Sequence, residues 1–217
     1  MPLPLILPLF PLPNVVLFPR VLLPLHIFEP RYCRMVKDVA AGDGLIGMIL
    51  LRDAESCGQG DDPDTYSVGC AGRMIRQVPL PDGRSNILLQ GVREFVPRQQ
   101  SRDRPYRTAE VDWLPPPPTG FELEGVIRDR LVKQIRAFVQ RAELNIEIRI
   151  LEDPAIADET LINLLSFGLD LPVEEKQSLL EICDTAVRAE RLIETIEFHL
   201  LEKEFVPGAE GKKHRRQ

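Results

Sequence analysis

The side chains that could act in acid–base catalysis are scattered along this sequence. A histidine general base needs a partner that positions it and a path to substrate. His26 stands between two apolar residues of an extended run, and His199 and His214 follow far downstream, so no metal-ligand spacing links the three. We therefore expect a structural role for His26, and no catalytic residue, metal or cofactor.

Acidic and sulfur-containing side chains fit no metal site either. Asp61, Asp62 and Asp64 could offer oxygen ligands, but an EF-hand loop is longer and ends in a bidentate carboxylate, so we expect a solvated loop. The cysteines form no CxxC pair that could chelate zinc or exchange disulfides, which predicts reduced and mostly buried thiols. They are Cys33, Cys57, Cys70 and Cys183.

Phosphate recognition has little support in the sequence. No GxxxxGK[ST] motif occurs, so no phosphate loop is available to bind ATP. Residues 1–114 hold 13 basic and 13 acidic side chains, whereas residues 115–217 hold 14 and 20, which gives the net charge of −6. Nucleic-acid binding needs a basic surplus, so such a partner is disfavoured. One local patch keeps RNA or small-ligand binding as an alternative: Arg98, Arg102, Arg104 and Arg107, around Tyr106.

Two neighbouring segments are candidates for protein binding. Apolar residues dominate positions 15–19 and 21–23, and an exposed patch of this kind would suit unfolded polypeptide, although burial in the fold is the alternative. Charged side chains surround Pro30, where they either face a partner or pair within the molecule. The candidate residues are Phe18, Arg20, Glu29, Arg31, Arg34 and Lys37.

Strand-like patterns occupy the first half of the chain. Short apolar runs bounded by prolines predict a strand at 5–10 and two extended pieces within 15–28. A buried strand is expected at 44–51, a hairpin over 66–97 with its turn at Pro81-Asp82-Gly83, and a last strand at 106–114. One helix, at about 30–41, interrupts them, with Pro30 in its first turn.

Helical spacing dominates the second half. An apolar stripe predicts a long helix over 120–143, and shorter patterns predict helices around 161–165, after Pro172 and over 182–201, with Asp158 and Asp170 as caps. The sequence thus predicts a strand-rich domain at 1–114, a proline linker at 115–118, a helical domain at 119–206 and a disordered basic tail at 207–217.

No targeting segment is evident. The first 19 residues lack charge, but six prolines break the apolar run and no positive region precedes it, so we expect neither a signal peptide nor a membrane span. These features predict a cytoplasmic location.

Several motifs resemble the amino-terminal domain of Lon proteases. They are Leu9-Phe10-Pro11-Leu12-Pro13, Leu17-Phe18-Pro19, the run from Leu23 to Tyr32, Val68-Gly69, Asp82-Gly83-Arg84 and the run from Leu171 to Glu181. Arg20, Cys33 and Cys70 depart from the family pattern, which has mainly a glycine, a charged residue and a threonine there.

This resemblance implies an α+β fold, with a PUA-like twisted β-barrel followed by a C-terminal helical bundle. It also implies a non-catalytic module that recognises unfolded or hydrophobic polypeptide segments in protein quality control, because the ATPase and serine–lysine protease parts of Lon are not found in the sequence. A full-length Lon protease is a second expected partner, and the chain is expected to be a monomer or a weak homodimer.

Overall fold

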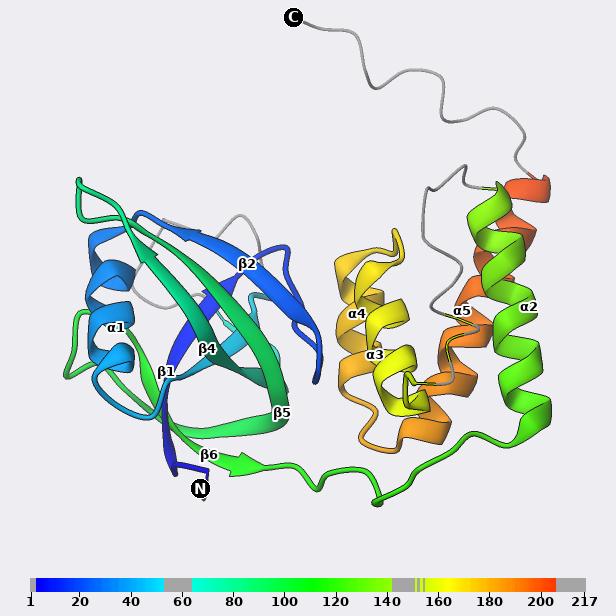
Figure 1. Ribbon diagram of the computed structural model, residues 1–217, viewed down its shortest axis with the longest axis horizontal. Coiled ribbons are helices and arrows are strands. Elements are labelled where there is room, and N and C mark those ends of the chain that lie inside the picture. Colours follow the sequence, from blue (N-terminus) through cyan, green and yellow to red (C-terminus); the bar gives the residue numbers. More distant parts are fainter. Residues whose placement is uncertain (1–2, 53–63, 142–150, 152, 154, 206–217) are drawn as a thin grey trace, which may run out of the picture.

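The computed structural model describes residues 3–52, 64–141, 151, 153 and 155–205, with side chains described up to residue 202. The predicted loop residues Asp61 and Asp62, Cys57, and the basic tail lie outside these residues. A sheet with one helix forms one side of the molecule, and four further helices form the other (Figure 1).

Six strands build a mixed sheet. They are β1 (Ile6–Leu12), β2 (Leu22–Ile27), β3 (Leu45–Leu50), β4 (Gly69–Pro79), β5 (Ser85–Ser101) and β6 (Thr108–Trp113). Their order is β2-β5-β4-β3-β1-β6, and β1 and β3 are parallel while the other neighbours are antiparallel. Because the long β5 also pairs with β6, five strands close into a ring: β1, β3, β4, β5 and β6. The sixth strand, β2, is not part of this ring and pairs with residues 85–90 of β5.

The hairpin predicted over 66–97 is confirmed. β4 and β5 are joined by a turn at 80–84, where the amide of Leu80 donates to the carbonyl of Arg84 over 2.8 Å. Gly83 has a φ of 85°, which an L side chain adopts only with strain. Asp82 also accepts a bond from the amide of Arg84, so the predicted turn residues do form the turn.

A turn at 19–20 divides the segment 15–28 into two pieces, as its apolar runs predicted, but only the second piece is a strand. Only β2 pairs, whereas residues 15–18 adopt no regular structure and bury Val16, Leu17 and Phe18 in the core. Pro13 and Pro19 bracket this stretch and lack the amide hydrogens that a strand ladder uses. Its apolar character therefore reflects burial of side chains and not strand pairing.

Helix α1 (Pro30–Ala40) confirms the helix predicted at 30–41, with Pro30 in its first turn. Tyr32, Met35 and Val36 face the core at helical spacing. The tilted Tyr32 and Phe10 rings, 4.3 Å apart, hold this helix against β1.

The remaining helices are α2 (Gly125–Arg141), α3 (Asp158–Gly168), α4 (Val173–Leu180) and α5 (Thr185–Phe205). The cap predictions are wrong. Ala157 and Pro172 occupy the two cap positions, and Asp158 instead accepts bonds from the amide of Leu123 (2.8 Å) and the guanidinium of Arg128 (2.7 Å). The unpredicted Asp184 caps α5, since its carboxylate accepts bonds from the amides of Ala186 and Val187.

The cysteine prediction is partly wrong. All described cysteines are free thiols, but Cys70 alone is buried, while Cys33 is half-buried and Cys183 is exposed. Burial raises the pKa of the Cys70 thiol well above its ordinary value, so this thiol stays protonated and unreactive.

The sheet and the helices share one apolar core, which runs from Phe10 and Leu89 to Leu192 and Ile196. Arg188 of α5 is only 2% exposed, and it crosses this core to bind the carboxylate of Glu94 on β5 at 2.6 Å. It also donates to Asn163 of α3 at 2.7 Å and to the carbonyl of Ile182 at 2.8 Å. A second link runs from the side-chain amide of Gln177 to the carbonyl of Val68 at 3.0 Å. Buried polar bonds therefore fix how the helices sit on the sheet.

A membrane-spanning helix must be both long and apolar. In the part of the chain that the structure describes, none of the helices combines this length with this composition.

Candidate functional site: an apolar groove beside an edge strand

An apolar groove of about 400 Å³ opens where the start of β2 meets α3. Val21, Leu165 and Leu169 form its buried floor, while Leu22, 48% exposed, stands at its rim. Leu164 and Phe167, both half-buried, and the exposed Gly168 complete the α3 wall, and Arg20 is the one charged residue in the lining. A cavity of this kind suits aliphatic or aromatic side chains.

The helical period of α3 explains its wall. Leu161, Ile162 and Leu165 turn into the core, which places Leu164 and Phe167 at the border of the groove. The ammonium of Lys176 donates to the carbonyl of Phe167 at 2.7 Å near the C-terminal end of α3. Burial lowers the pKa of this ammonium, and the contact fixes the helix end beside the groove.

The opposite wall is held by close backbone contact with β5. The amide of Arg20 donates to the carbonyl of Gly91 at 2.8 Å, and the amide of Gly91 donates to the carbonyl of Val21 at 2.9 Å. A Cβ on Gly91 would lie 2.0 Å from the carbonyl oxygen of Phe18, so only glycine permits this approach. Arg20 is therefore fixed in space, and its φ is 69°.

β2 offers a further binding feature beside the groove. Among the described strands it pairs with β5 alone, so one side of its backbone has no strand partner. Pro24, in the middle of β2, is exposed, as is usual for a proline in an edge strand. An extended peptide could add to such an edge and place a side chain in the groove.

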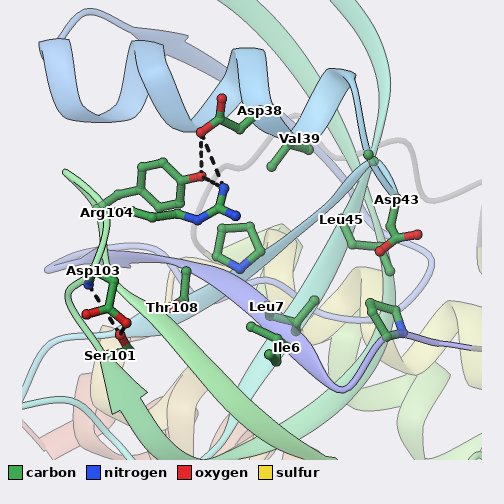
Figure 2. Close-up of a pocket in the computed structure, with 15 residues that line it drawn as sticks. Ile6, Leu7, Asp38, Val39, Asp43, Leu45, Ser101, Asp103, Arg104 and Thr108 are labelled. Carbon is green, nitrogen blue, oxygen red and sulfur yellow. Dashed lines mark hydrogen bonds and ion pairs between the residues drawn. The ribbon is translucent and has the colours of Figure 1, made fainter.

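A second cavity, of about 450 Å³, lies at the other end of the sheet between α1, β1 and the loop before β6 (Figure 2). The hydroxyl of Tyr106 donates to Asp38 at 2.8 Å, and Arg104 donates to the Tyr106 oxygen at 2.9 Å and to Asp38 at 3.4 Å. The bond from Tyr106 is the main reason that the pKa of Asp38 falls, whereas burial alone would raise it. Burial in turn raises the pKa of Tyr106, and Arg104 opposes this.

The structure does not bring the six predicted protein-binding residues together. Phe18 has no exposed surface and lies 5.8 Å below the Arg188 guanidinium, so its proposed contact with a partner is wrong. Arg20 alone lies at the groove. The other four candidates, Glu29, Arg31, Arg34 and Lys37, lie in α1 or directly before it. Helix α1 covers the end of the sheet that is far from α3 (Figure 1). Glu29 pairs with Arg31 at 2.9 Å and Arg34 with Asp38 at 3.0 Å, while Lys37 is exposed.

The arginine patch proposed for RNA is engaged in internal contacts. Arg98 binds Asp112 across β5 and β6, and Arg104 binds Asp38 and Tyr106. Arg102 and Arg107 also have interaction partners. These contacts reduce the positive charge available for a polyanion.

The two histidines that the structure describes, His26 and His199, lie far apart in the sequence and on different elements. His26 is exposed on β2, and its Nδ1 lies 2.7 Å from Asn86 Oδ1. His199 lies in α5, 2.8 Å from Glu175 of α4.

Sequence patterns missed Leu164 and Phe167 as site residues because an apolar side chain on a groove wall and one in the core have the same helical period.

The fold and the groove together define a class of protein. It is a mixed α+β domain whose sheet and helices share one core and border an apolar groove. The comparison with known families is more specific. The family model described as the ATP-dependent protease La (LON) substrate-binding domain matches residues 6–197, and the chain belongs to this family.

The relatives agree with this assignment. The chain is 29% identical to a Lon protease of Cytophaga hutchinsonii and 30% identical to one of Flavobacterium johnsoniae. These alignments cover 89% and 90% of the chain but only 24% of each relative, so the chain spans about a quarter of their length.

Two solved structures share the fold. The crystal structure of a Lon N-terminal domain protein from Xanthomonas campestris matches with a TM-score of 0.64 and 25% identity, over 87% of this chain and 97% of that one. The N-terminal domain of Lon protease from Mycobacterium avium complex matches with a TM-score of 0.66 and 16% identity, over 89% and 99%.

Proposed function

We propose that this protein binds exposed apolar segments of unfolded polypeptides, which lie extended along β2 with a side chain in the groove. The observation that carries this proposal is the position of the groove: its apolar lining adjoins a strand edge that has no partner among the described strands. Backbone bonds to β2 would give affinity for any sequence, and the groove would select apolar side chains.

The expected affinity is modest. Burying one leucine-sized side chain contributes about 1.5–3 kcal/mol, and ordering an unfolded segment offsets part of that gain. Affinities in the high micromolar range, which correspond to roughly −5 to −6 kcal/mol, suit a module that samples many clients without trapping them.

The closed strand ring of residues 1–114 supports describing the sheet as a PUA-like barrel, with residues 115–118 as a linker and 119–206 as a helical bundle. Within this arrangement the groove lies where barrel and bundle meet. We propose a role in protein quality control in the cytoplasm, with a full-length Lon protease as a second partner, because the relatives are Lon proteases.

Small-ligand binding is the second candidate, and the cavity of Figure 2 favours it over RNA binding. The Asp38–Tyr106–Arg104 network lies on its wall and combines a carboxylate, a hydroxyl and a guanidinium next to apolar side chains. A thermal-shift assay with a panel of metabolites tests this function. The Tyr106→Phe substitution should lower the affinity for any ligand that the assay reveals.

Peptide binding to paired variants tests the first proposal. The double variant Leu22→Ser and Leu164→Ser should weaken binding of a labelled apolar peptide at least about tenfold, which is about 1.4 kcal/mol. Val126→Ser is the matched control, because Val126 is 81% exposed on α2 and lies outside the groove lining. Equal affinities for all three proteins in fluorescence anisotropy would refute the groove as the site.

A further inference from the structure

A third cavity, a pocket of about 350 Å³, adjoins the apolar groove, and the two share Arg20. Residues 92–94 of β5 form one wall. Pro116, Pro117, Pro118 and Phe121 form much of the opposite wall. The exposed side chain of Arg20 therefore stands at the boundary between an apolar cavity and one that also holds charged groups.

Arg20 and Arg93 both line this pocket, and neither makes an ion pair or a side-chain hydrogen bond with the described residues. Arg93 is half-buried, so its charge is only partly exposed to solvent. Two arginines in one partly enclosed cavity repel each other unless an anion lies between them. Guanidinium groups match carboxylates in shape as well as in charge.

The two carboxylates of the pocket do not neutralise these arginines. Glu94 is bound to the buried Arg188 at 2.6 Å, and its side chain is 10% exposed. Glu159 is half-buried on α3 and makes no ion pair with either arginine. Arg20 and Arg93 therefore have no ion-pair partner among the described residues, although Glu159 lines the same pocket.

Arg20 is also the one non-glycine residue with a positive φ in the described chain. This backbone conformation strains an L side chain, and the bonds to Gly91 hold Arg20 in it. A glycine would fit here without strain, so folding alone does not account for an arginine at this position.

We propose that Arg20 and Arg93 form a carboxylate-recognition site, so that the groove prefers apolar segments in which an aspartate or glutamate follows or precedes the buried side chain. This inference rests on the proposed function, because it names the class of segment that the groove selects. The apolar residue occupies the groove, and the acidic side chain reaches past Arg20 into the pocket.

An acidic side chain suits the pocket better than a chain terminus does. The groove and the pocket are separate cavities that share Arg20, so we expect a segment that occupies both to pass Arg20 and continue beyond it. The proline-rich wall supplies no amide hydrogens from its three prolines to surround a terminal carboxylate.

Four labelled peptides with one apolar core test the preference. Three have amidated C-termini and carry glutamate, glutamine or lysine beside the core, and the fourth is neutral with a free C-terminal carboxylate. We expect the glutamate peptide to bind at least about tenfold more tightly than the glutamine peptide at low salt, and the lysine peptide to bind most weakly.

The variants Arg20→Gly and Arg93→Gln should each reduce the glutamate-to-glutamine affinity ratio at least about threefold, chiefly by weakening the binding of the glutamate peptide. Arg191→Gln is the control, because Arg191 is exposed on α5 and lies outside both cavities. Thermal melting should show Arg20→Gly to be at least as stable as the wild type; if it unfolds instead, Arg93→Gln alone carries the test.

The outcomes separate the two proposals. Equal binding of the glutamate and glutamine peptides overturns the carboxylate site and leaves the groove intact. If no peptide binds, the proposed function itself fails. Preference for the free terminus over the glutamate side chain also overturns the assignment.

Discussion

The two cavities at opposite ends of the sheet are similar in size but differ in what their side chains leave unsatisfied. In the cavity of Figure 2, Asp38, Tyr106 and Arg104 satisfy one another. In the groove and its adjoining pocket, the apolar side chain of Leu22 is 48% exposed. Arg20 and Arg93 make no ion pair with the described residues. Cavity volume therefore does not distinguish the two sites, whereas the arginines without ion-pair partners favour the groove and its adjoining pocket.

The cavities also differ in how they are supported. Beside the pocket that adjoins the groove, Arg188, Glu94 and Asn163 are buried and connect three elements. In the Figure 2 network, Tyr106 is buried, but the charged side chains of Asp38 and Arg104 are partly exposed. Substitutions in the Arg188 cluster should therefore cost more stability than those beside Asp38.

The largest effect should come from Arg188→Ala. Its removal leaves Glu94 buried without its partner, and breaking a buried ion pair costs about 3–5 kcal/mol. Urea unfolding measures the loss. Arg191→Ala is the control, because its ion pair with Glu194 is about 60% exposed and should change stability by less than about 0.5 kcal/mol. Similar losses for the two variants would contradict the distinction between the regions.

A smaller loss is expected for Gly91→Ala. The new Cβ would meet the backbone of Phe18 at 2.0 Å, so the wall that carries Arg20 must move, at a cost of about 1–3 kcal/mol. Peptide affinity should fall with it. Gly83→Ala, in open space at a φ of 85°, should destabilise the hairpin turn but leave peptide binding unchanged. If Gly91→Ala keeps the peptide affinity of the wild type, this wall of the groove does not take part in binding.

The smallest effect should come from Tyr106→Phe. The pKa of Asp38 lies below its ordinary value of 3.8, first because of the bond from Tyr106, so this carboxylate stabilises the fold above that pH. The contribution disappears as the pH falls below 3.8, and it should be smaller in Tyr106→Phe. Thermal melts from pH 6 to pH 2 measure it; an unchanged pH profile in the variant would contradict the assignment, and peptide binding at pH 7 should not change.

The sequence predicted local structure well where one residue type determines the backbone. Pro30 and the spacing of Tyr32, Met35 and Val36 predicted α1, and Asp82-Gly83 predicted the hairpin turn. The resemblance predicted the family, which the match over residues 6–197 confirms.

The groove could not be predicted because it depends on long-range packing. Nothing local indicates that Val21 and Leu165 line the same cavity, or that Arg188 reaches Glu94 across the core. The cap predictions failed for the same reason, since Asp158 is recruited by Leu123 and Arg128 instead of its own helix. Phe18 was misassigned because an apolar run has the same appearance whether it is buried or exposed.

The most direct test of the central claim is an amide NMR titration of the intact chain with an unfolded apolar peptide. The account predicts that shift changes concentrate in residues 20–27 and 164–169, at β2 and the groove, and that Asp38, Tyr106 and Thr108 stay unaffected. Changes concentrated around Asp38 and Tyr106, or an absence of changes at millimolar peptide, would contradict it.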